Sequence, residues 1–147
     1  MPIQGSCLCG SVKFEIAEVV GPFEICHCNR CRKVSGTSGL AALGVKTEGY
    51  RFIEGRELIK TYVAPILNNP PAYETYFCSI CGSPLPPPEP EGDWTEVPAG
   101  LLDDDPGMKP DKHIFVEFNP EWSNIDDGID QYTLRQLAKV RYGTDLP

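Results

Sequence analysis

The chain has 147 residues, a length that suits one domain with a single hydrophobic core. Its formal net charge of -8 argues against general nucleic-acid binding, because phosphate groups require a basic surface. The sequence has no apolar run long enough to span a bilayer, and its start, "MPIQGSCLCG", lacks the basic and apolar segments of a secretory signal, so a cytoplasmic location is expected.

Short β-strands are predicted along the first half of the chain. Residues 11–16 alternate, with Val12, Phe14 and Ile16 on one face, which is typical of a half-buried strand. Residues 54–56, Glu-Gly-Arg, predict a hairpin turn. Further strands are expected at residues 23–28, 40–45, 50–53, 57–63 and 73–77.

The second half contains a proline-rich segment, a strand and a helix. Residues 84–110 hold eight of the fifteen prolines and predict a long ordered loop or flap, with a short strand at 94–97. The sequence "HIFVEF" at 113–118 predicts another strand. Residues 133–143 predict a helix, since Thr133 and Gln136 have the spacing of a capping box. With a second helical turn after Cys28, the fold class is mainly β.

The seven cysteines form two pairs and one triplet: Cys7 and Cys9, Cys78 and Cys81, and Cys26, Cys28 and Cys31. In a reducing compartment clustered cysteines bind metal more often than they form disulfides. Structural zinc takes four thiolate or imidazole ligands, whereas catalytic zinc takes three and keeps one position open. The two pairs therefore predict one closed zinc site, and the triplet predicts a second, open one. Thioredoxin-like redox chemistry at the second pair is an alternative, although the βαβ context is missing.

The triplet has its own alternatives. His27, His113 or a carboxylate could close the site and make it structural, and His113 could instead carry a proton. If the segment is extended, the His27 side chain points away from a metal that Cys26 and Cys28 share. Thiolate clusters also accept iron, and the triplet could sense oxidants when it holds no zinc. Arg30, Arg32 and Lys33 either offset the thiolate charge or bind the carboxylates of an anionic thiol.

The sequence also resembles a known family. The stretches "GSCLCGSV" at 5–12, "CHCNRCRKVSG" at 26–36 and "FCSICGSPL" at 77–85 are similar to the signature blocks of the glutathione-dependent formaldehyde-activating enzymes. "AGLLDD" at 99–104 and "PDKHIFVEF" at 110–118 resemble its later blocks. The resemblance covers residues from about 5 to about 128.

This resemblance implies a fold of small antiparallel sheets assembled around zinc, called a β-tent. It implies a structural zinc ion on the residues matching Cys7, Cys9, Cys78 and Cys81, and a labile zinc ion on those matching Cys26, Cys28 and Cys31. The implied activity is that of a carbon–sulfur lyase that joins glutathione, or a similar thiol, with formaldehyde or a small aldehyde to give an S-hydroxymethyl adduct.

The expectation is thus a single zinc-binding domain over residues 1–147, with a core at about 5–128 and the helix at 133–143. Its partners would be a small thiol and an aldehyde, with no nucleic acid and no membrane. Cys26, Cys28 and Cys31 would carry the chemistry, and Arg30, Arg32 and Lys33 would contact the substrate. The rival from another class is a zinc-stabilised binding module of the same fold, whose second metal only orders a loop.

Overall fold

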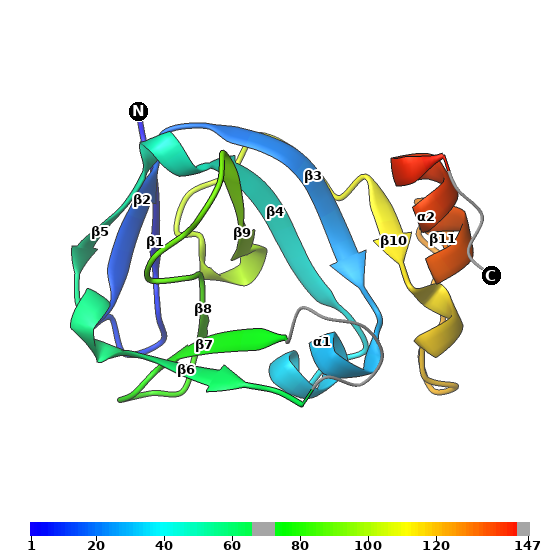
Figure 1. Cartoon of the computed structure of the whole chain (residues 1–147), viewed down its shortest axis with the longest axis horizontal. Helices are drawn as coiled ribbons and strands as arrows, with labels where there is room; N and C mark the ends of the chain where they lie inside the picture. The colour runs from blue at the N-terminus through cyan, green and yellow to red at the C-terminus, as the bar shows by residue number, and fades with distance from the viewer. Residues whose placement is uncertain (66–72, 144–147) are drawn as a thin grey trace. The chain divides into compact units, whose positions relative to one another are not determined.

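The computed structural model describes residues 1–65 and 73–143. The chain forms two compact units. Figure 1 labels the helices and strands along the chain, coloured from blue at the N-terminus to red at the C-terminus. The first unit comprises Met1–Gly21 and Leu43–Gly107, and the second comprises Pro22–Ala42 and Met108–Pro147. Two strands, β3 (Val19–Cys26) and β4 (Leu40–Lys46), carry residues of both units.

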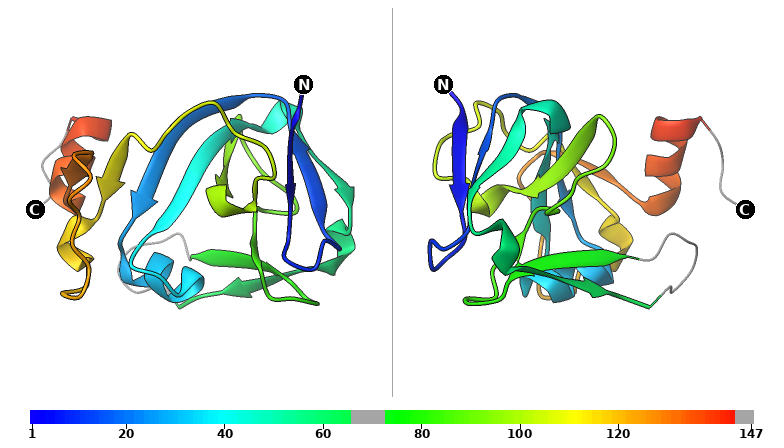
Figure 2. Two further views of the ribbon diagram at one scale, coloured as in Figure 1. Left: turned by 180° about the vertical axis from the view of Figure 1, so that it is seen from behind. Right: turned by 60° about the vertical axis from the view of Figure 1, so that its left-hand side comes forward.

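The first sheet of the first unit has the order β1-β2-β5 and is antiparallel. Its strands are β1 (Ile3–Ser6), β2 (Lys13–Ile16) and β5 (Tyr50–Glu54). Both views in Figure 2 show β1 beside β2. The predicted alternation is confirmed, because Val12, Phe14 and Ile16 are fully buried. Gly5 pairs with Phe14, and a Cβ atom at Gly5 would lie 2.3 Å from the Phe14 ring, so only glycine fits there.

The second sheet of this unit has the order β6-β7-β8 and is also antiparallel. Its strands are β6 (Ile59–Val63), β7 (Glu74–Cys78) and β8 (Pro84–Leu85). The hairpin predicted at residues 54–56 is wrong, because β5 and β6 belong to different sheets. Gly55 has a φ of 78°, and a 3-10 turn at Arg56–Leu58 follows it, so the chain leaves one sheet and enters the next.

The proline-rich segment is tied to the rest of the first unit by hydrogen bonds. The Tyr50 hydroxyl donates to the Pro87 carbonyl at 3.0 Å, and Arg56 Nε donates to the Pro88 carbonyl at 2.8 Å. Pro86 is fully buried. The predicted short strand is present as β9 (Trp94–Pro98), the neighbour of β4, and a 3-10 turn at Ala99–Leu101 follows it. The segment is therefore part of the packed structure of this unit.

In the second unit β10 lies between β11 and β3 and is parallel to both. The bounds are Lys112–Ile114 for β10 and Asp130–Tyr132 for β11. The strand predicted at residues 113–118 is thus shorter than expected. Phe115 has a φ of 56°, the one positive value among the described non-glycine residues, and a 3-10 turn at Val116–Phe118 follows it. This turn ends the strand after Ile114.

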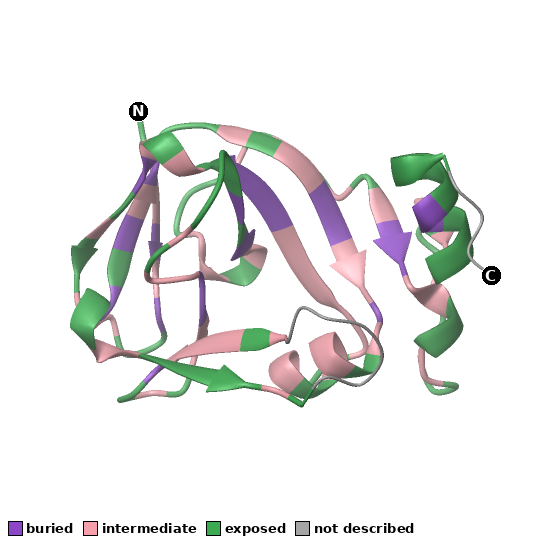
Figure 3. Cartoon of the chain, in the orientation of Figure 1, coloured by how far each residue is buried: buried purple, intermediate pink, exposed green. Residues whose placement is uncertain are grey.

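Two helices complete the second unit. Helix α1 (Asn29–Ser35) follows Cys28 as predicted and ends at Gly36, whose φ is 70°. Helix α2 (Leu134–Tyr142) has the predicted capping box, in which Thr133 Oγ1 accepts from the Gln136 amide and Gln136 Oε1 accepts from the Thr133 amide. Figure 3 shows α2 exposed along most of its length, and its buried residues are Leu137 and Ala138.

The observed architecture confirms the mainly β fold class, with small antiparallel sheets and a short C-terminal helix. The parallel pairs of β10 are the part of the topology that was not expected. Among the described residues, none of the helices has the length and apolar character needed to cross a membrane.

Candidate metal centres

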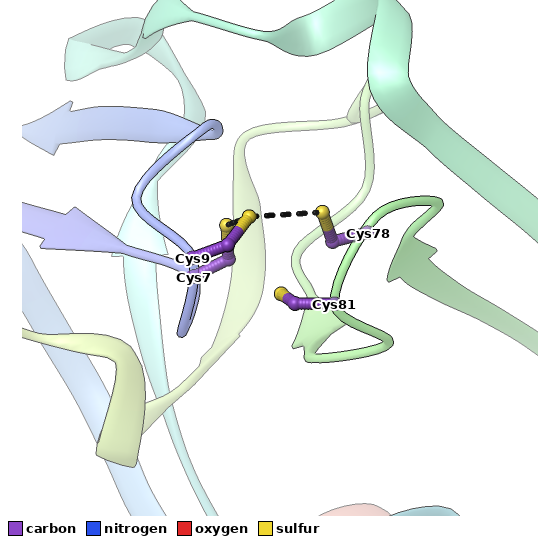
Figure 4. Close-up of side chains that lie close together, drawn as sticks. All are labelled: Cys7, Cys9, Cys78 and Cys81. Carbon is purple, nitrogen blue, oxygen red and sulfur yellow. Dashed lines mark hydrogen bonds between the residues drawn. The ribbon is translucent and has the colours of Figure 1, made fainter.

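The two cysteine pairs come together in the first unit. The sulfur atoms of Cys7, Cys9, Cys78 and Cys81 all lie within 4.8 Å of one another (Figure 4). Cys7 Sγ is 3.6 Å from Cys9 Sγ, and Cys9 Sγ is 3.9 Å from Cys78 Sγ. None of the seven cysteines forms a disulfide. Residues about seventy positions apart in the sequence therefore meet in one cluster of thiols.

Two tight turns position these four sulfurs close together. Gly10 N–H donates to the Cys7 carbonyl at 2.9 Å, and Gly82 N–H donates to the Cys78 carbonyl at 2.8 Å. Both glycines have φ near 77°, a conformation that side chains with a Cβ atom rarely adopt. Backbone amides also point at the sulfurs, since Val12 N–H donates to Cys7 Sγ at 3.3 Å. The pattern of a glycine directly after each pair predicted this geometry.

Ser83 joins the two turns, and sequence reasoning missed it. Its hydroxyl accepts a hydrogen bond from the Leu8 amide at 3.0 Å and lies 3.3 Å from Cys81 Sγ. Its carbonyl accepts from the Cys78 amide at 3.0 Å. Its hydroxyl and amide hydrogen bonds lower the pKa of Cys81 to about 5. A serine next to the glycine of a C-x-x-C-G turn was the available signal.

The four sulfurs fit a tetrahedral thiolate site. Zinc–sulfur bonds of about 2.3 Å at tetrahedral angles place sulfur atoms roughly 3.8 Å apart, close to the two distances above. The cluster also borders the apolar core, because Cys7 and Cys78 are buried with Val12 and Leu85. Burial raises the pKa of Cys7, which a bound cation would reverse. The donor set and its spacing are those of a closed metal site.

The triplet comes together in the second unit. Strand β3 ends at Cys26, Cys28 is the N-cap of α1, and Cys31 lies in the first turn of that helix. The Cys31 amide donates to Cys28 Sγ at 3.4 Å. The three sulfurs lie within 4.8 Å of one another, and each cysteine is partly exposed. Within residues 1–65 and 73–143, this group includes no fourth histidine, cysteine or carboxylate ligand.

The pKa values of two thiols in the triplet shift in opposite directions. Hydrogen bonds from Cys26 and Cys31, together with backbone amides, lower the pKa of Cys28 far below its ordinary value. The same sulfur contacts raise the pKa of Cys26, because a second thiolate beside the first is unfavourable. A divalent cation at this point would relieve that repulsion and hold all three as thiolates. The donor set therefore fits a metal ion with one open position.

Neither histidine completes the triplet. His27 Nδ1 lies 2.8 Å from the Ser38 carbonyl, and His27 Nε2 lies 2.8 Å from His113 Nδ1. His113 Nε2 lies 2.7 Å from Asp127 Oδ2. Both ring nitrogens of both residues thus face protein partners. The His27 ring faces Ser38 and His113 and is not part of the three-sulfur group.

The sequence and fold match known proteins. The model of the glutathione-dependent formaldehyde-activating enzyme family matches residues 2–118 of this chain. The chain belongs to that family. A protein of Halomonas elongata with the provisional name glutathione-dependent formaldehyde-activating enzyme is 32% identical over 131 residues, which are 86% of this chain and 82% of that protein. A crystal structure of a Rhodobacter sphaeroides protein shares the fold, with a TM-score of 0.53 at 20% identity, covering 88% of this chain and 99% of that one.

In this family member the predicted substrate contacts lie on helix α1. Arg32 donates to Asn29 Oδ1 at 2.6 Å, and its buried Nε has no hydrogen-bond partner in the described part of the chain. Lys33 is exposed and Arg30 is half-buried. Arg32 and Lys33 also occupy the last turn of the helix, where the helix dipole favours cations. Both readings of these basic residues are compatible with this arrangement.

Charge is distributed unevenly between the two units. The first unit has thirteen acidic and five basic residues, whereas the second has eight of each. The formal net charge of -8 therefore falls entirely in the first unit. The unit that carries the triplet is neutral apart from its thiols, and this lowers the electrostatic cost of bringing an anion there.

Proposed function

We propose that this chain is a zinc-dependent enzyme of the carbon–sulfur lyase type, which joins glutathione or a similar thiol with formaldehyde or a small aldehyde. The observation that carries the proposal is the triplet, in which three sulfurs converge with no fourth protein ligand among the described residues. Membership of the family supplies the substrate class. We further infer that residues 1–147 act as one zinc-binding domain.

Two zinc ions would serve different purposes. Cys7, Cys9, Cys78 and Cys81 would hold the structural ion, and Cys26, Cys28 and Cys31 would hold the labile one. When bound at the triplet, zinc supplies Lewis acidity, which keeps a thiol deprotonated at neutral pH. The three cysteines set the position of the incoming sulfur. Arg30, Arg32 and Lys33 are the candidate partners for the substrate carboxylates.

The overall reaction is an addition. A bond forms between the thiol sulfur and the aldehyde carbon, the π bond of the carbonyl breaks, and its electron pair moves to oxygen. The proton that the thiol gives up is balanced by one that this oxygen gains. His113 is 4% exposed and both its ring nitrogens face protein groups. We therefore assign to water the delivery of the proton that the aldehyde oxygen gains.

The experiment compares zinc-loaded protein with its Cys28→Ser variant in formaldehyde consumption with glutathione. We expect the catalysed rate, measured above the uncatalysed reaction, to fall at least about 100-fold in the variant. The reason is that loss of one metal ligand also removes the position at which the substrate thiol would bind. Lys60→Ala, an exposed change in the other unit, is the control and retains the full rate. Equal rates for wild type and Cys28→Ser would favour the binding module instead.

A further inference from the structure

Three hydrogen bonds join four residues of the second unit in a row: the Ser38 carbonyl, His27, His113 and the Asp127 carboxylate. The three distances lie between 2.7 and 2.8 Å. His27 is 3% exposed and His113 is 4% exposed, whereas the Asp127 side chain is 42% exposed. The row therefore leads from the surface to a buried imidazole pair.

The ends of the row determine the direction of its two outer hydrogen bonds. The Ser38 carbonyl can only accept, so His27 Nδ1 carries a proton and donates to it. The hydrogen bond from His113 lowers the pKa of Asp127, so that its side chain is a carboxylate and accepts as well. His113 Nε2 is consequently a donor.

The row holds the segment that carries the triplet. His27 lies between Cys26 and Cys28, and its amide donates to the Ile114 carbonyl at 3.0 Å. Ser38 follows helix α1, so the His27 ring connects the chain before that helix to the chain after it. A Cβ atom at Gly39 would lie 2.9 Å from His27 Cε1, so the ring fits closely in this position.

We propose that Asp127 is a positioning residue for the three-cysteine metal site, acting through His113 and His27 on the segment that carries the sulfurs. The inference rests on the proposed function in one respect, that the triplet binds a metal ion. Asp127 lies beyond residues 2–118, which the family model matches. Outer partners that orient ligands typically contribute 10- to 100-fold to metal affinity.

Two variants of Asp127 separate its hydrogen bond from its charge. In Asp127→Asn, Oδ1 keeps its bond from the Ile129 amide, which is 3.0 Å long in the wild type, and Nδ2 donates to His113 Nε2. The row then keeps a hydrogen bond at each of its three positions. Asp127→Ala removes the bond to His113 and leaves little cavity, because the side chain is 42% exposed and solvent can fill the space. Asp126→Ala removes the neighbouring exposed carboxylate and is the control.

The experiment measures zinc release from zinc-loaded protein to a chromogenic chelator over a range of chelator concentrations. We expect two ions in the wild type, one held more weakly by the triplet. We expect Asp127→Ala to lower the zinc affinity of the triplet about 10-fold. Asp127→Asn and Asp126→Ala should leave that affinity within about 2-fold of the wild-type value. The ion of the four-cysteine site is an internal reference and is unchanged in all four proteins.

Each other outcome contradicts a specific statement. Wild-type affinity in Asp127→Ala, or an equal loss in Asp127→Asn, overturns the positioning role while the proposed function stands. An equal loss of zinc affinity at both sites in Asp127→Ala indicates general destabilisation and also overturns the positioning role. A wild-type protein that binds one zinc ion, with none on the triplet, removes the proposed function and the inference with it.

Discussion

Single residues decide how closely the triplet segment packs, and Gly39 is the clearest case. Its φ lies outside the range that strains side chains, so only space limits what can occupy the position. A Cβ atom there would approach Ile25 Cγ2 to 2.7 Å and His27 Cε1 to 2.9 Å. These contacts are with buried or half-buried side chains of β3 and of the cysteine segment, which have little room to move.

We expect Gly39→Ala to lower the free energy of unfolding by about 2 kcal/mol, because overpacking forces these side chains apart. Gly100→Ala is the matched control, since a Cβ atom at Gly100 meets nothing within 4 Å. Alanine at Gly100 should leave stability unchanged or raise it slightly. Urea unfolding of the three proteins measures the difference. Equal midpoints for Gly39→Ala and Gly100→Ala would contradict the close fit of the His27 ring.

Helix α2 depends on one buried carboxylate as well as on its capping box. Glu24 on β3 is 5% exposed and accepts from Arg141 of the helix, while Lys112 Nζ lies 3.2 Å from Glu24 Oε2. Burial lowers the pKa of Lys112, but hydrogen bonds to Asp111 and Glu24 outweigh that effect and raise it. The carboxylate of Glu24 therefore balances two partly buried cations.

Replacing Glu24 with glutamine should remove the carboxylate that accepts from Arg141 and leave Lys112 with Asp111 alone. We expect Glu24→Gln to cost about 3 kcal/mol, near the lower end for a broken buried ion pair because Arg141 is partly exposed. Hydrogen exchange at the α2 amides reports the loss directly, since the helix should open first. Glu121→Gln, an exposed change in the same unit, should exchange as the wild type does. Unaltered α2 protection in Glu24→Gln would show that packing of Leu137 and Ala138 holds the helix alone.

At the scale of the whole molecule, the two sulfur clusters lie in different units, and metal ions bound to them should contribute differently to stability. The four-cysteine cluster joins residues near positions 7 and 78 of the first unit, and its thiols border the apolar core. The triplet spans six residues of one segment. A metal ion closing the longer loop constrains far more of the unfolded chain, so its removal costs more folding free energy.

Chelation should therefore affect the first unit most. We expect removal of zinc from the four-cysteine cluster to lower the melting temperature by at least 10 °C, since structural zinc supplies several kcal/mol to a domain of this size. Hydrogen exchange should rise first near Val12 and Leu85, which pack against Cys7 and Cys78. Loss of the triplet ion alone, as in Cys28→Ser, is the control and should shift melting by only a few degrees. Equal shifts in the two cases would contradict the division into a structural and a labile ion.

The sequence by itself determined the fold class, the grouping of the seven cysteines and the capped C-terminal helix. These features are local, because spacing, alternation and cap residues act within a few positions of one another. Only the tertiary structure decided the parallel strands around β10, the early end of that strand at Phe115, and the row from Ser38 to Asp127. Those features join residues as much as 88 positions apart, and no local pattern specifies which distant partner a buried imidazole will meet.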